Sequence, residues 1–215
     1  MERNHLYALF GEAKLKGWEV DINNFPDLPD ERFYPKPLDL FKALELIRPD
    51  AVRYLVLGQD PYFTASNDVP DAIGIAFALN SENPKFPPSL QRILKHIHSN
   101  KEGKKDLTDW ITCKGVLLLN AALTVPANNQ RSSAGKHLKL GIWDEFVIQI
   151  IKQLLKVNPT VKMIAWGIPA RDKLMAALIE SKVPYTWCYH PVASKTGINS
   201  YTSFWQTELG LSLKM

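Results

Sequence analysis

The chain has 215 residues, 46% hydrophobic and 22% charged, which is the composition of a globular protein with a sizeable core. Its formal net charge of +4 permits an anionic partner such as nucleic acid without requiring one. Two cysteines and five scattered histidines do not supply the clustered ligands of a zinc site, so we expect no metal. Neither a signal peptide nor an apolar run of about 18 residues is found, so we expect a cytoplasmic or nuclear protein with both thiols buried and reduced.

Predicted helices and buried strands alternate along most of the chain. Residues 1–36 are polar, aromatic and proline-rich, and we expect an irregular N-terminal arm that wraps a single domain spanning residues 1–215. Apolar residues at helical spacing predict helices over residues 40–47, 88–98, 142–157, 169–181 and 200–209. Continuous apolar runs predict strands over residues 53–57, 115–119, 161–166 and 185–189. This alternation is typical of the α/β class, in which helices cover both faces of a parallel sheet.

Residues capable of binding or catalysis follow all four predicted strands. The first strand is followed by the motif GQDPY (58–62), the second by Asn120, the third by Gly167 and the fourth by His190-Pro191. Because ligands of parallel sheets bind beyond the carboxyl ends of the strands, these residues are expected to converge on one site. The site would combine a carboxylate, an amide, a glycine turn and an imidazole.

This combination indicates hydrolysis by water, because no nucleophilic serine or cysteine belongs to it. Asp60 can orient or activate a water, and His190 can donate a hydrogen bond to a leaving group that becomes negative. The Asn120 amide, held in one orientation, can recognise an edge that offers both a donor and an acceptor. Taken singly, the three residues are also explained as a helix N-cap, a structural histidine and a turn former. The pattern alone therefore indicates a hydrolase or a ligand-binding α/β domain.

Several motifs resemble those of the family 1 uracil-DNA glycosylases, in the same order and at similar spacing. They are GQDPY (58–62), GIAF (74–77), PPSL (87–90), GVLLLNAALTV (115–125), WG (166–167) and HP (190–191). The resemblance covers about residues 30–207 and implies a three-layer α/β/α fold around a four-stranded parallel sheet. It implies a DNA repair enzyme that hydrolyses the N-glycosidic bond of uracil, releases free uracil and leaves an abasic site, without a cofactor or metal. The implied partner is uracil-containing DNA, single- or double-stranded, and we expect a monomer.

The resemblance also assigns roles to individual residues. Asp60 resembles the carboxylate that positions the water, and His190 the donor to the uracil oxygen. Four residues resemble those that bind the base: Gln59 through its backbone, Tyr62 beside uracil C5, Phe77 as the stacking ring, and Asn120 at the polar edge. Contacts with the DNA backbone are assigned to Pro87, Pro88, Ser89, Gly167, Ser194 and Lys195. For Ser89, a plain helix N-cap is an equally good explanation.

Two departures from the family pattern add residues, and the first of them lies near the water site. Phe63 stands where the family usually has histidine, and it begins an insertion over residues 63–73. The segment 126–142 also looks extended, and its polar and basic composition suits either a DNA-facing loop or a solvated one.

Two further departures affect the contacts with duplex DNA. Ser194 occupies the position of the leucine that wedges into the duplex, and Ile198 is a candidate to replace it. After Gly167 the usual serine is Ile168, which has no hydroxyl to offer a phosphate. We therefore expect the chemistry and base choice to be retained, and base flipping from a duplex to be weakened or achieved differently.

Two alternatives to uracil excision stay open. One is a DNA-binding or replication-scaffold protein of the same fold with little or no catalysis, although such a protein would not need Asp60, Asn120 and His190 together. The other is a glycosylase for another damaged pyrimidine, which Tyr62 and Asn120 disfavour and the altered pocket rim allows.

Overall fold

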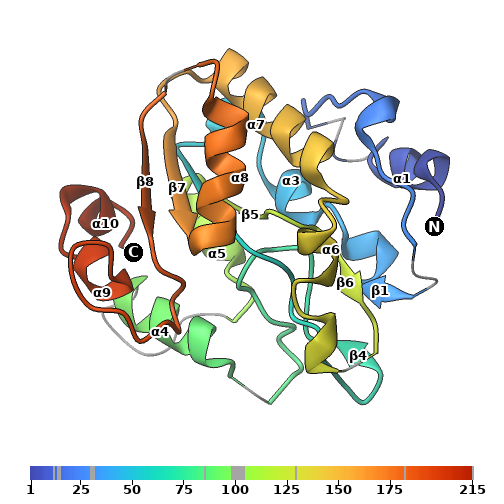
Figure 1. The fold of residues 1–215 in the computed structure, drawn as a ribbon, viewed down its shortest axis with the longest axis horizontal. Coiled ribbons are helices and arrows are strands. Elements are labelled where there is room, and N and C mark those ends of the chain that lie inside the picture. Colours follow the sequence, from blue (N-terminus) through green and yellow to red (C-terminus); the bar gives the residue numbers. More distant parts are fainter. Residues whose placement is uncertain are drawn as a thin grey trace.

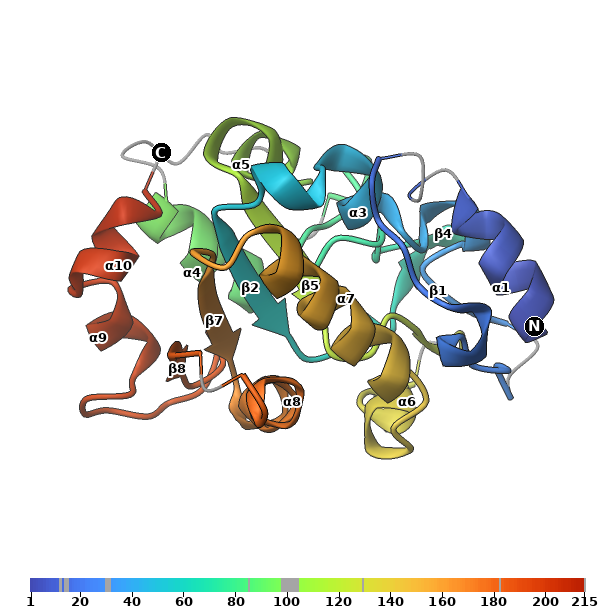
Figure 2. The ribbon, with the colours of Figure 1, turned by 90° about the horizontal axis from the view of Figure 1, so that it is seen from above.

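The structure is a computed structural model that describes residues 1–11, 13, 16–29, 32–84, 86–97, 105–128, 130–181 and 183–214. Four parallel strands form its central sheet in the order β5-β2-β7-β8 (Figures 1 and 2). Their bounds are Tyr54–Gly58 for β2, Val116–Asn120 for β5, Lys162–Trp166 for β7 and Tyr185–Cys188 for β8. Every residue of β2 and β5 is buried, as expected for strands read from continuous apolar runs. All four predicted strands are confirmed.

Helices cover both faces of this sheet. On one face, α8 (Ile168–Leu178) packs against β7 and β2, with α7 (Asp144–Val157) beside it. On the opposite face, α3 (Lys42–Leu46) and α5 (Thr108–Lys114) pack against β5 (Figure 2). Another helix, α4 (Pro88–Ile97), lies near the end of the molecule toward which β7 and β8 point (Figure 1). The three-layer α/β/α arrangement is therefore confirmed.

Short elements connect these layers. The short helices are α1 (Arg3–Leu9), α6 (Lys136–Lys139), α9 (Tyr201–Phe204) and α10 (Glu208–Ser212). The 3-10 turns among the described residues are η1 (Ile22–Asn24), η2 (Pro37–Asp39), η3 (Pro49–Ala51) and η4 (Arg131–Ser133). Two small antiparallel pairs join β1 (Phe33–Tyr34) to β6 (Val125–Pro126) and β3 (Ala65–Ser66) to β4 (Val69–Pro70). Within the described residues, no helix has the length and apolar composition needed to cross a membrane.

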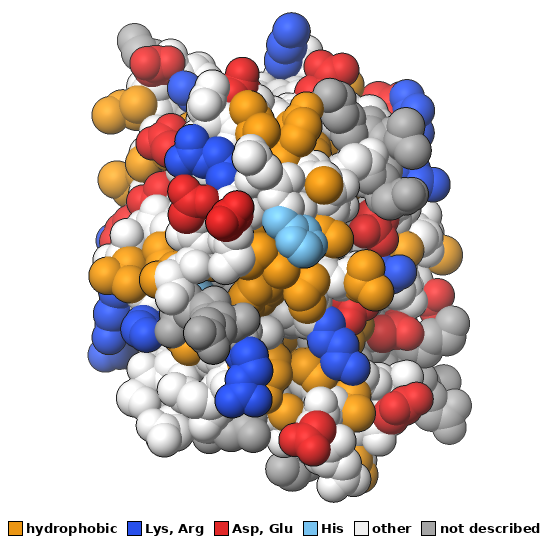
Figure 3. Space-filling view, turned by 90° about the vertical axis from the view of Figure 1, so that its right-hand side faces the viewer, with side chains coloured by type: hydrophobic (Ala, Val, Ile, Leu, Met, Phe, Trp, Pro, Cys, Tyr) orange, Lys and Arg blue, Asp and Glu red, His pale blue; other side chains and the backbone are white. Residues whose placement is uncertain are grey.

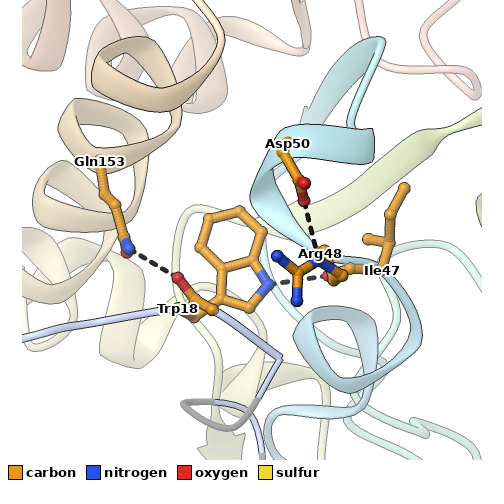
Figure 4. Close-up of polar contacts among 6 residues, drawn as sticks. Trp18, Ile47, Arg48, Asp50 and Gln153 are labelled. Atoms are coloured by element: carbon orange, nitrogen blue, oxygen red, sulfur yellow. Dashed lines mark hydrogen bonds and ion pairs between the residues drawn. The ribbon is translucent and has the colours of Figure 1, made fainter.

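The N-terminal segment packs into the core of the molecule. Its Phe10 and Phe25 rings meet Phe41 and Phe146 edge-on, with the centroids of Phe10 and Phe41 separated by 5.2 Å and those of Phe25 and Phe146 by 5.0 Å. Trp18 is fully buried and donates its indole N–H to the carbonyl oxygen of Ile47 at 2.9 Å (Figure 4).

Two hydrogen bonds also attach the N-terminal segment to α7. The side-chain amide of Gln153 donates to the carbonyl oxygen of Gly17 at 2.9 Å (Figure 4). The side-chain oxygen of Gln153 accepts from the backbone N–H of Glu19 at 2.8 Å. The segment expected to be irregular therefore contains helix α1 and is held by buried rings and backbone hydrogen bonds.

Three sequence expectations differ from the structure in detail. The predicted helix over 200–209 is two short helices, α9 and α10, because Thr207 caps a new helix by accepting from the N–H of Gly210. The predicted helix over 88–98 is α4, and its last expected residue, His98, lies outside the described residues. Cys113, expected to be buried, is exposed near the end of α5, whereas Cys188 is buried in β8.

Candidate active site

The carboxyl ends of the strands open into a cavity of about 620 Å³. Six residues predicted for catalysis or base binding line it: Gln59, Asp60, Tyr62, Phe77, Asn120 and His190. They come from the turn after β2, the loop that follows the β3–β4 hairpin, the end of β5 and the turn after β8. The parallel sheet thus gathers side chains that are up to 131 residues apart in the sequence (Gln59 to His190).

Asp60 is held by the segment that the sequence suggested was extended. Its Oδ2 accepts a hydrogen bond from the backbone N–H of Gly135 at 2.6 Å. Gly135 has φ of +70°, a left-handed conformation that glycine adopts without steric cost, so the turn before α6 can present this N–H. Oδ1 is then the oxygen through which Asp60 can act on a water in the cavity.

Two opposing effects set the protonation of Asp60. Burial raises the pKa of its carboxyl group, because the charged form is poorly solvated inside the protein. The hydrogen bond from Gly135 and the positive charge of Lys139 lower the pKa. Burial is the larger effect, so the pKa of Asp60 is raised overall, and the segment 131–141 offsets part of that rise.

Asn120 and Phe77 are packed tightly against the end of β2. Asn120 lies opposite Gly58 in the parallel register of β2 and β5. A Cβ atom at Gly58 would lie 2.7 Å from Asn120 Oδ1 and 2.9 Å from Phe77 Cε2, so only glycine leaves room for both side chains. Phe77 itself has φ of +65°, which is uncommon for a residue with a side chain and often marks a functional site. The amide and the ring are thereby fixed next to each other at the cavity wall.

Tyr62 links the base pocket to the start of α4. Its hydroxyl donates to the carbonyl oxygen of Phe77 at 3.0 Å and lies 2.9 Å from Ser89 Oγ. Burial raises the pKa of Tyr62 to about 12, so its hydroxyl stays protonated at neutral pH. The Ser89 hydroxyl, in the first turn of α4, is therefore hydrogen-bonded to Tyr62. Pro87, Pro88 and Ser89 all line the same cavity.

His190 is a neutral imidazole in this environment. Burial lowers its pKa to about 4, so the ring is uncharged at neutral pH. The backbone N–H of Val192 donates to its Nδ1 at 3.4 Å, which assigns the ring proton to Nε2. The Phe77 ring lies beside it, with the two ring centroids 5.7 Å apart. His190 can therefore act as a hydrogen-bond donor through Nε2 without carrying a charge.

Comparison with known proteins identifies the family. The sequence profile described as "Uracil DNA glycosylase superfamily" matches residues 45–207 of the chain. The chain belongs to this superfamily. The uracil-DNA glycosylase of Streptococcus sanguinis is 36% identical over 177 residues, which cover 80% of this chain and 76% of that protein. The Helicobacter pylori enzyme of the same name is 35% identical over 149 residues, covering 66% of this chain and 61% of that protein.

Solved structures of the superfamily share the fold. The crystal structure of mimivirus uracil-DNA glycosylase matches with a TM-score of 0.63 and 26% identity, over 74% of this chain and 57% of that chain. The UNG from Nitratifractor salsuginis matches over 98% of both chains with a TM-score of 0.63. Its identity of 20% makes this second likeness one of fold alone.

The remaining superfamily positions predicted to contact DNA lie outside the main cavity. A Cβ atom at Gly167 would lie 2.2 Å from Nε2 of Gln59, so this glycine is required for the Gln59 side chain to pack beside it. Ser194 and Lys195 are exposed in the loop after β8. Ile168 is 43% exposed at the start of α8, and Ile198 is 91% exposed in the loop that contains Ser194. The structure thus leaves both Ser194 and Ile198, the two residues considered for the wedge, accessible.

Two segments in which this chain is longer than the family pattern, residues 63–73 and 126–142, also contribute to the site. Phe63 and Arg131 line the main cavity, although the sequence did not predict that either binds substrate. The insertion forms the β3–β4 hairpin, in which Asp71 accepts hydrogen bonds from the Thr64 hydroxyl and the Asn83 amide. The Gly135 contact with Asp60 joins residues 75 positions apart, and no sequence pattern indicates it. Among the described residues, no three metal-binding side chains lie close enough to hold a metal ion.

Proposed function

We propose that this protein excises uracil from DNA by hydrolysing the bond between uracil N1 and the deoxyribose C1′. The observation that carries this proposal is the convergence of Asp60, Asn120, Phe77 and His190 on one cavity at the carboxyl ends of the strands. A base inside a duplex cannot reach such a cavity, so it must be flipped out of the helix, which costs a few kcal/mol. Contacts in the cavity offset that cost.

Base recognition is assigned to three side chains. The Phe77 ring would stack on the flat face of uracil, and the Asn120 amide would accept from N3–H and donate to O4. Cytosine presents the reverse pattern at this edge, and a mismatched buried edge is rejected by roughly 10⁴-fold in comparable sites. Tyr62, held by Ser89 and the Phe77 carbonyl, would collide with the methyl group of thymine.

Bond cleavage is assigned to Asp60 and His190. As the C1′–N1 bond breaks, positive charge develops on the sugar and negative charge on uracil. The Asp60 carboxylate would stabilise the sugar cation and orient a water through Oδ1, while Gly135 holds Oδ2. The water oxygen forms the new bond to C1′ and gives up a proton to the Asp60 carboxylate, and uracil leaves as an anion that accepts a hydrogen bond from Nε2 of His190.

Contacts with the DNA backbone are assigned to the turn before α4 and the loops after β7 and β8. Pro87, Pro88 and Ser89 line the cavity at the start of α4, where the backbone of a flipped nucleotide would pass. Gly167, Ser194 and Lys195 would extend this contact from the loops after β7 and β8. Because Ile168 lacks a hydroxyl and Ser194 lacks an apolar side chain, we propose that excision from single-stranded DNA is less impaired than excision from a duplex. We further propose that the protein acts as a monomer on DNA in a cytoplasm or nucleus, and that residues 1–215 form one domain.

A uracil-release assay tests this proposal directly. Uracil-containing oligonucleotides, single-stranded and duplex, are incubated with the protein and with Asp60→Asn, and free uracil is measured. We expect release by the protein and a large loss in the variant. Release no greater than that of Asp60→Asn would contradict the proposal and favour a DNA-binding role.

A further inference from the structure

A groove on the outer side of α4 is not used by the proposed chemistry. It encloses about 500 Å³ and is lined by Phe86, Gln91, Arg92, Leu94 and Lys95. Two of these described residues are cationic and none is acidic. By contrast, the face shown in Figure 3 carries acidic and basic side chains interspersed among hydrophobic ones. The groove is therefore a local site of positive charge that suits an anionic chain.

Phe86 is held in place at one end of this groove. The Lys105 ammonium group lies over one face of its ring, 4.3 Å from the centroid. The side-chain amide of Gln91 donates to the carbonyl oxygen of Phe86 at 2.7 Å, which fixes the backbone. The side chain nevertheless remains 37% exposed and lines the groove. A large apolar ring that is fixed and still exposed is suited to stacking with a flat ligand.

The groove adjoins the active-site cavity through α4. Ser89, in the first turn of α4, lines the main cavity, and Arg92 lies three residues further along the same helix. Arg92 donates through Nη1 to the carbonyl oxygen of Pro191 at 2.6 Å, directly next to His190. A strand whose uracil occupies the main cavity would thus pass into the groove as it leaves.

We propose that this groove holds the nucleotide adjacent to the flipped uracil on the same strand, with its base stacked on Phe86. The proposal rests on the proposed uracil excision and extends it to the bases that flank uracil. Lys95 and Arg92 would lie along the phosphates of this nucleotide. Stacking on an aromatic side chain accepts any base, so the groove adds affinity for single-stranded DNA without sequence preference.

Binding of two matched oligonucleotides tests the proposal. Both are short single strands with one non-hydrolysable uracil nucleotide, and in the second the bases flanking uracil are replaced by abasic residues. Dissociation constants are measured by fluorescence anisotropy for the wild type, Phe86→Ala and Phe86→Trp. Leu38→Ala, which removes another exposed apolar side chain, serves as the matched control.

We expect Phe86→Ala to weaken binding of the first oligonucleotide by roughly 5- to 150-fold and to leave binding of the abasic-flanked one nearly unchanged. Phe86→Trp should bind both like the wild type. Lys95→Gln should reduce the slope of log affinity against log salt by about 0.7, the value for one phosphate contact on a single strand. Equal losses on both oligonucleotides, or no loss on either, would overturn the proposal.

Uracil release separates this proposal from the proposed function. It is measured with hydrolysable versions of both oligonucleotides. If the wild type releases uracil and the Phe86→Ala penalty does not depend on the flanking bases, the groove proposal fails while the glycosylase proposal stands. If the wild type releases no uracil from either, the proposed function fails, and the groove proposal, which extends it, fails with it.

Discussion

The hydroxyl oxygen of Tyr62 and the side-chain oxygen of Ser89 lie 2.9 Å apart, in hydrogen-bond contact. Tyr62 donates its only hydroxyl proton to the carbonyl of Phe77, so Ser89 is the donor in this pair. A residue assigned to the DNA backbone is therefore bonded to the residue assigned to exclude thymine. Any movement of Ser89 toward a phosphate would alter the hydrogen bonding that holds the Tyr62 ring.

The first prediction concerns this pair. Tyr62→Ala removes the ring that occupies the space beside uracil C5, so thymine should become a substrate. The preference for uracil over thymine should fall by roughly 10- to 200-fold, the range for one methyl group in an apolar pocket. Tyr62→Phe and Ser89→Ala keep the ring and should retain most of the discrimination. The measurement is kcat/KM for release of the two bases, and unchanged discrimination in Tyr62→Ala would contradict the assignment.

The second prediction separates activity from stability at Asp60. Asp60→Asn should lower kcat by roughly 10²- to 10⁴-fold, because an amide cannot carry the negative charge. Because burial raises the pKa of Asp60, its ionised form is disfavoured in the folded state, and the neutral amide should stabilise the fold. We therefore expect a higher Tm for Asp60→Asn than for the wild type at neutral pH. Asp172→Asn, at an exposed ion pair with Arg171, is the control and should show no rise.

The third prediction concerns stability and His190. Its pKa is near 6.5 in the unfolded chain and about 4 in the folded protein, so between these values the unfolded chain binds the extra proton. The contribution of His190 to stability should therefore be complete above pH 6.5 and be lost as the pH falls toward 4. Thermal melts over this range should show a steeper fall in Tm for the wild type than for His190→Gln, which has no titrating ring. Parallel curves would contradict a neutral buried imidazole.

The fourth prediction concerns the charge that Lys139 places near Asp60. Lys139→Gln removes a group that lowers the Asp60 pKa, so the acid limb of kcat/KM should move to higher pH. The shift should be largest at low ionic strength and should shrink with added salt, because Lys139 is exposed. Lys152→Gln, on the exposed side of α7, should leave the limb in place. A limb that does not move at low salt would show that Lys139 does not act on Asp60.

The fifth prediction concerns entry into the duplex. Ile198 is the most exposed of the large hydrophobic side chains in the described part of the loop after β8. If it enters the duplex when uracil leaves, Ile198→Ser should lower excision from duplex DNA about 10-fold or more and leave excision from single strands unchanged. Ile179→Ser, the same change at the 77% exposed end of α8, is the control. Equal losses on both substrates would exclude a wedge role.

The strands and the residues at their ends could be predicted from the sequence because both signals are local. Buried strands such as β5 are continuous apolar runs, and the carboxyl ends of parallel strands meet at one edge of the sheet. The apolar pattern alone therefore singles out Asp60, Asn120 and His190 as neighbours in space. The family motifs add Gln59, Tyr62 and Phe77, which lie in turns that have no periodicity of their own.

Features that depend on contacts between residues far apart in the chain could not be predicted from the sequence. The sequence of helix α1 is largely polar and carries little helical signal of its own. The helix is positioned by the adjoining Phe10 ring, which packs against Phe41 and Phe146, far along the chain. The β3–β4 hairpin did carry a local signal, since Asn67 and Asp68 both have positive φ, as in the tight turns these residues favour. The contact of Gly135 with Asp60 has no such signal, because a backbone N–H is common to nearly every residue.

The crowding at Gly58 has a consequence for how this site can change. One added methyl group at that position would collide with both Asn120 and Phe77. The shape of the base pocket therefore depends on a glycine at the end of a buried strand. New base preferences are therefore more accessible through the hairpin and the outer loops, where atoms can be added without displacing the two residues that read the base. The sheet therefore fixes the dimensions of the base pocket, whereas the surrounding loops can change to suit different forms of DNA.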